Sequence, residues 1–176
     1  MASNMKREKR EQHDVMRFMV EDAKLIYLNF AGRPTPFNTV GGVKGFGVVL
    51  PPDLAEQMMK DGWNVRYRED RAGEEDNQDE PYISVKVRFD KKPPRIVMIT
   101  STSKVPLDEA SVEVLDWADI QTADLIANSS WYDVNGKTGY TAYLKTLVVT
   151  IEEDYLETKY GINEPAHAMV NGVIDD

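Results

Sequence analysis

Aromatic and basic side chains alternate with apolar ones along residues 82–89 (YISVKVRF). In an extended chain Tyr82, Lys86 and Arg88 point to one side, while every second residue, always apolar, points to the other. Aromatic rings can stack on unpaired nucleic-acid bases, and nearby cations can contact the phosphates. The same alternation is equally expected of an ordinary antiparallel strand, whose outer face is polar.

Residues of the same two types recur on other segments that are predicted to be extended. Arg66 and Arg68 share one side of such a segment, and Tyr143 and Lys145 share one side of a later one. The candidate residues for binding a single-stranded nucleic acid are Tyr82, Lys86, Arg88, Tyr143, Lys145, Arg66, Arg68, Lys44, Phe37, Trp131, Lys137 and Tyr67.

Signatures of catalysis are scarce. The chain has no cysteine, which excludes thiolate nucleophiles and disulfides and is compatible with a reducing compartment. Its two histidines, His13 and His167, lie near the two ends, so a buried histidine-centred triad is not expected. An enzyme that uses carboxylates on nucleotides or sugars is supported only by the abundance of aspartate and glutamate. We therefore predict no catalytic residue and no cofactor.

Phosphate-loop and metal-site patterns are also missing. The glycines between residues 41 and 47 have neither the phosphate-loop spacing nor the dinucleotide spacing. Asp116, Asp119 and Asp124 are irregularly spaced, and we interpret them as solvated turn carboxylates rather than metal ligands. The prediction for metals is therefore none.

The negative charge of the chain is concentrated in two segments. The formal net charge is −9, but residues 69–80 and residues 151–176 each contain seven acids and one base. Each segment therefore carries −6, which leaves +3 for the rest of the chain. Because the local potential governs ion binding, a nucleic-acid partner is compatible with this distribution.

The elements that would position the candidate residues are mostly strands. Short extended segments are predicted at 23–30, 43–50, 63–68, 82–89, 96–100, 122–132 and 138–151. Helices are predicted at 5–20, 53–61 and 107–115, with a fourth short one at 152–160 as an option; Asp53 would cap the second, and Gly62 would end it. This order favours a small β-barrel over a parallel α/β sheet. Phe46 and Trp63 lie beside glycines that flank the helix predicted at 53–61, and both are expected in the core of the barrel.

The chain is expected to contain one domain and two appendages. We place a basic extension at residues 1–20, the domain at 21–161 and a flexible acidic tail at 162–176. No run of about 20 apolar residues is present, so no membrane-spanning helix and no membrane partner are expected.

Several short motifs occur in a consistent order between about residues 25 and 160. They are Phe46-Gly47-Val48, Asp61-Gly62-Trp63, Glu80-Pro81-Tyr82, Trp131 with Asn135-Gly136-Lys137 and Gly139, and Ala142-Tyr143-Leu144-Lys145. With them the chain resembles a family of bacteriophage single-stranded DNA-binding proteins with an OB fold. The resemblance implies a five-stranded Greek-key barrel with an added hairpin and two or three short helices.

The resemblance also implies a function and partners. Such a protein would coat and protect single-stranded DNA, without reading its sequence, during phage replication or recombination in the cytoplasm of the infected bacterium. Its acidic tail would contact phage or host replication proteins, although this tail ends on its acids rather than on an aromatic residue. A homo-oligomer is compatible with the sequence, and stacking does not distinguish DNA from RNA. The alternative is a phage structural or assembly β-barrel that makes only protein contacts.

Overall fold

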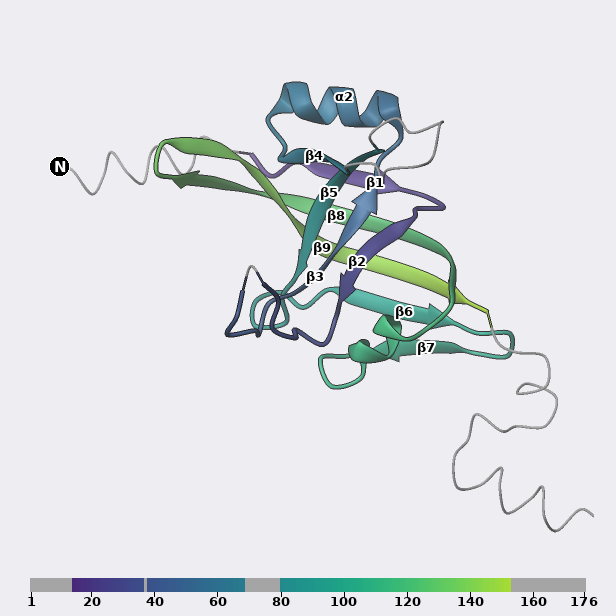
Figure 1. The fold of residues 1–176 in the computed structure, drawn as a ribbon. Coiled ribbons are helices and arrows are strands. Elements are labelled where there is room, and N and C mark those ends of the chain that lie inside the picture. The colour runs from purple at the N-terminus through teal and green to yellow at the C-terminus, as the bar shows by residue number, and fades with distance from the viewer. Residues whose placement is uncertain (1–13, 37, 69–79, 153–176) are drawn as a thin grey trace, which may run out of the picture.

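The computed structural model describes residues 14–36, 38–68 and 80–152, and these residues are mainly β (Figure 1). They form one nine-stranded sheet, one α-helix and one short 3-10 helix. The strands are β1 (Arg17–Val20), β2 (Leu25–Asn29), β3 (Lys44–Val49), β4 (Val65–Arg68), β5 (Glu80–Val87), β6 (Arg95–Ile99), β7 (Lys104–Leu107), β8 (Ile120–Val134) and β9 (Lys137–Ile151), and the helices are α2 (Pro52–Asp61) and η1 (Val112–Asp116).

The sheet is open and mixed, and its main path has the strand order β1-β8-β9-β5-β3-β2. The other three strands lie off this path: β4 pairs with β5, and β6 pairs with β9 and with β7. Neighbouring strands are antiparallel except that β9 runs parallel to both β5 and β6. The strand β9 changes neighbour along its length, because it pairs with β5 at Ala142 and Tyr143 and with β6 from Thr146 onward. Lys145 lies at this change, where the register with β8 also shifts.

Successive side chains of a strand point to opposite sides of a sheet, and the apolar residues of these strands occupy every second position. One side of the sheet therefore faces a core of apolar side chains. Phe46 and Val48 of β3 are paired with Val85 and Ile83 of β5, and all four residues belong to this core. We call the opposite side, which carries residues such as Lys86, the outer face. The predicted core positions of Phe46 and Trp63 are confirmed.

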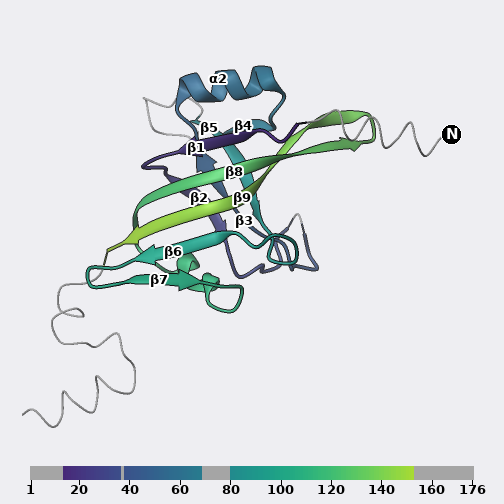
Figure 2. The ribbon, with the colours of Figure 1, turned by 180° about the vertical axis from the view of Figure 1, so that it is seen from behind.

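The β8–β9 hairpin projects beyond the other strands (Figures 1 and 2). Asn135 and Gly136, with φ of 53° and 79°, make a two-residue turn between Val134 and Lys137, tighter than the predicted loop. We call residues 130–141 the arm. Edge-on and tilted aromatic contacts hold its base, with ring centroids 5.1 Å apart for Phe18 and Trp63, 6.1 Å for Trp63 and Tyr140, and 5.0 Å for Tyr140 and Trp131.

Three expectations about helices need correction. Residues 17–20 form a strand rather than part of a helix, because Phe18 and Val20 alternate into the core and pair with β8. Asp53 is not the N-cap of α2: the cap position is Pro51, which gives no side-chain hydrogen bond. In the segment 107–115 the helical part is the short η1, because strand β7 extends to Leu107 before it.

The predicted helical end at Gly62 is confirmed, and it allows a stability test. Gly62 has φ of 95°, and its N–H bonds to the carbonyls of Met58 and Met59. Gly62→Ala should lower the free energy of unfolding by about 1 kcal/mol, because a side chain is strained in this left-handed conformation. Chemical denaturation would measure the loss. The control Lys60→Ala should lower the free energy of unfolding by less than about 0.5 kcal/mol. An equal loss in both variants would show that the left-handed backbone of Gly62 is not the cause.

Candidate nucleic-acid interface

The outer face of β5 carries the polar half of the alternating pattern. Ser84 and Lys86 are exposed there and Tyr82 is half-buried, whereas Ile83 and Val85 are almost completely buried on the other side. The predicted division of this strand into two faces is therefore confirmed. Arg66 of β4 pairs with Tyr82 and so extends the same face.

Two cations of this face flank one aromatic ring. Lys86 pairs with Tyr143 across the parallel β5–β9 contact. The Lys86 Nζ lies 5.9 Å and the Arg88 Cζ 5.8 Å from the centre of the Tyr143 ring, which is within the range of cation–π attraction. Tyr143 and Arg88 also line a surface depression of about 250 Å³. Its other lining residues are Lys91, Lys92, Asn128, Ser130 and Leu144.

Arg88 is paired with a carboxylate on the same face. Its Nε and Nη2 donate to the two oxygens of Asp90 at 3.1 and 2.8 Å. These hydrogen bonds, with a smaller contribution from Tyr143, hold the pKa of Arg88 above its usual value. In return, Arg88 holds the pKa of the Asp90 carboxyl below its usual range. At neutral pH this ion pair therefore offsets part of the positive charge of the depression.

Tyr27 is a residue of this face that the sequence pattern did not reveal. The β2–β3 register shifts between Ile26, opposite Gly47, and Asn29, opposite Gly45, so that β2 contains one extra residue. Tyr27 lies in this bulge with φ of 53°, and 61% of the surface of the residue is exposed. A non-glycine residue in this conformation is uncommon, and strained residues of this kind cluster at functional sites as well as in turns.

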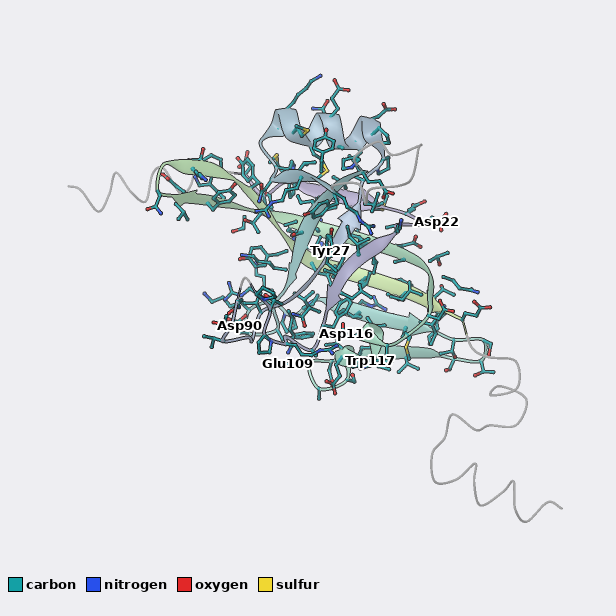
Figure 3. All side chains as sticks on the ribbon, viewed as in Figure 1. Asp22, Tyr27, Asp90, Glu109, Asp116 and Trp117 are labelled. Carbon is teal, nitrogen blue, oxygen red and sulfur yellow. The ribbon has the colours of Figure 1, made fainter. Side chains whose placement is uncertain are left out.

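The bulge brings the ring of Tyr27 next to Tyr82. Their centroids are 5.6 Å apart in an edge-on arrangement, and the Arg68 Cζ lies 5.9 Å from the Tyr27 ring. Two aromatic residues and a cation thus meet at one place on the outer face. Figure 3 shows Tyr27 near the middle of the region formed by β2, β3 and β5.

Backbone without side chains forms part of the floor between Tyr27 and Lys86. Gly45 and Gly47 pair with Lys86 and Ser84 and line a second depression, of about 270 Å³, which Lys44 also lines. A Cβ on Gly45 would lie 2.7 Å from the Val85 carbonyl oxygen. Gly45 therefore marks a close approach of two backbones, which a side chain at this position would prevent.

The other candidates lie apart from these two depressions. Tyr67 points to the opposite side of β4, and its hydroxyl donates to the Met59 sulfur at 3.4 Å. Trp131 and Lys137 belong to the arm, and Lys145 is exposed where β9 changes neighbour. Phe37 lies outside the described residues, as do 1–13, 69–79, most of the possible helix at 152–160, and the acidic tail.

The carboxylate of Asp116 has a structural role, which corrects its interpretation as solvated. Its side chain is only 1% exposed. It accepts hydrogen bonds from the N–H groups of Phe30 and Ala31 at 2.7 and 3.0 Å and pairs with Arg33 Nη2 at 3.1 Å. Its partners are more than 80 residues away in sequence, so local spacing gave no signal of them.

Neither a metal cluster nor a membrane helix is found in the described part of the chain. Within residues 14–36, 38–68 and 80–152, no three or more histidine, cysteine, aspartate or glutamate side chains are grouped to hold a metal ion. In the same ranges no helix is long and apolar enough to span a bilayer.

A β-sheet protein with aromatic rings, cations and bare backbone on one outer face fits the class that binds unpaired nucleic acid. The family model described as "Putative phage ssDNA-binding domain" matches residues 5–173, nearly the whole chain, and the chain belongs to this family. The resemblance of the motifs to such phage proteins is thereby confirmed. No curated protein matches the sequence.

Proposed function

We propose that the protein binds single-stranded DNA on its outer face without reading the base sequence. The observation that carries the proposal is the grouping of Tyr27 with Tyr82, and of Tyr143 with Lys86 and Arg88, on the same side of the sheet. Bases would stack on the rings, and phosphates would follow the cations. Stacking accepts every base, so affinity would depend little on sequence.

The biological role follows from this activity and from the family. The protein would coat and protect single strands during phage DNA replication or recombination, in the cytoplasm of the infected bacterium, and would catalyse no reaction. The acidic tail would contact phage or host replication proteins and compete with DNA for the basic face. We also propose that the sheet is a variant of the OB fold, in which the β8–β9 hairpin is an addition; membership of the family and the mainly β architecture support this assignment.

A titration with oligo-dT at low salt tests the proposed function. Fluorescence anisotropy should show binding, and the logarithm of the association constant should fall linearly with the logarithm of salt concentration, by about 0.7 per phosphate contacted. Matched DNA and RNA oligomers would show whether the sugar matters. Absence of binding at low salt, together with a stable and salt-insensitive oligomer in light scattering, would instead support a structural or assembly protein.

Removing the ion pair between Arg88 and Asp90 should strengthen the binding of single-stranded DNA. Asp90→Asn removes a negative charge and releases Arg88, so affinity for oligo-dT should rise about threefold to tenfold at low salt. Asp61→Asn at the end of α2 is the control, because it makes the same change of charge away from the outer face. Equal gains in both variants would show that only net charge matters.

A further inference from the structure

Trp117 is an exposed aromatic residue that lies outside the two depressions. It directly follows η1, and 72% of its surface is exposed. Tryptophan is usually buried over most of its surface, so a ring this accessible is unusual. The exposed ring presents an area on which another flat group can stack.

The ring is held in place by a buried anchor. The Arg33 Cζ lies 4.6 Å from the centre of the Trp117 ring. Arg33 in turn pairs with Asp116, whose carboxylate is fixed by the N–H groups of Phe30 and Ala31. Such a fixed ring loses little conformational entropy when a ligand stacks on it.

Arg33 connects this ring to the interface. It lines the glycine-floored depression together with Tyr27, Asn29 and Lys86. Asp116 and Trp117 lie below Tyr27 in Figure 3, at the end of the molecule that also holds Asp90. A strand that leaves the depression past Arg33 would therefore meet Trp117 next.

We propose that Trp117, backed by Arg33, is an additional stacking platform for an unpaired base of the same DNA strand. Arg33 supplies a cation to the adjoining phosphate, and the open face of the indole receives the base. The platform lengthens the binding path from the sheet onto the loop after η1. This inference rests on the proposed function, and a longer oligonucleotide is needed to reach it.

Oligonucleotides of two lengths separate the platform from the rest of the interface. The wild type, Trp117→Ala and Trp117→Tyr would be titrated with oligo-dT of about 4 and about 16 nucleotides, which span the range of site sizes for such domains. For the longer oligomer, Trp117→Ala should bind roughly fivefold to a hundredfold more weakly, and Trp117→Tyr should recover most of the affinity. For the shorter oligomer the three proteins should bind alike.

A spectroscopic readout and a control accompany the titration. The longer oligomer should quench the tryptophan fluorescence of the wild type, and Trp117→Ala should lose most of this quenching. Val114→Ala, an exposed change on η1 itself, should behave as the wild type, and thermal unfolding would verify that each variant folds.

Each other outcome has a defined meaning. Equal affinity of the wild type and Trp117→Ala for the longer oligomer would overturn the platform, and so would an equal loss for both lengths. If the wild type itself binds neither oligomer, the proposed function is wrong, and this result is obtained without the Trp117 variants.

Discussion

Reversing the charges of Lys86 and Arg88 together should weaken binding of oligo-dT at low salt by roughly a hundredfold or more. Both side chains are exposed and lie within 6 Å of the Tyr143 ring, so the change would replace two proposed phosphate contacts by two repulsive charges. The measurement is a fluorescence titration of Lys86→Glu with Arg88→Glu against the wild type. The milder double variant, Lys86→Ala with Arg88→Ala, should make the dependence of the association constant on salt less steep. The slope of its logarithm against the logarithm of salt concentration should fall in magnitude by about one to two.

A matched control distinguishes this face from net charge. Lys60→Glu with Lys104→Glu makes the same change of charge on α2 and β7, at exposed positions outside the two depressions. This control should keep most of the affinity. An equal loss in both double variants would mean that binding responds to the overall charge, and retention of affinity by the first would mean that DNA lies elsewhere.

Replacing Tyr27 should separate binding from stability. Tyr27→Ala and Tyr27→Gly both remove the ring that meets Tyr82, so both should bind oligo-dT about fivefold to a hundredfold more weakly. Their stabilities should differ, because only glycine adopts φ of 53° without strain. Tyr27→Gly should therefore be more stable than Tyr27→Ala by about 1 kcal/mol.

Anisotropy with oligo-dT and chemical denaturation measure the two quantities in the same samples. If Tyr27→Ala is at least as stable as Tyr27→Gly, the left-handed backbone of Tyr27 carries no strain. If both variants bind as the wild type does, the aromatic pair is a structural contact only. Tyr67→Ala serves as the control, since Tyr67 points to the other side of its strand, toward Met59.

Local patterns predicted those parts of the fold that depend on near neighbours in sequence. The faces of β5 follow from strict alternation, and the end of α2 follows from Gly62, because both are decided within a few residues. Strand β1 was missed because its four residues become a strand only by pairing with β8, more than a hundred residues later. Strand β7, between Ser103 and Asp108, was also not predicted.

In the candidate site, too, local patterns predicted single residues but not the contacts between residues that are far apart in sequence. Lys86 and Arg88 were found from their alternation, but their arrangement around Tyr143 depends on a parallel contact between distant strands. Tyr27 reaches the outer face only because a register shift against β3 inserts it into a bulge. Asp116 and Arg33, like Trp117, acquire their roles through contacts across more than 80 residues, which no local spacing encodes.

The net charge of −9 is compatible with the proposed basic binding face because the acids are segregated in sequence. Of the charged residues that line the two depressions, all are lysines or arginines: Arg33, Lys44, Lys86, Arg88, Lys91 and Lys92. Asp90 beside Arg88 is an acid placed next to this group. The local field, rather than the total charge, would therefore attract the phosphates.

Photo-crosslinking tests the central claim most directly. An oligonucleotide that carries bromodeoxyuridine would be bound at low salt and irradiated, and the modified peptides would be identified by mass spectrometry. We predict crosslinks to peptides that contain Tyr27, Tyr82 or Tyr143. Crosslinks confined to the arm or to α2, with none on the outer face, would contradict the account.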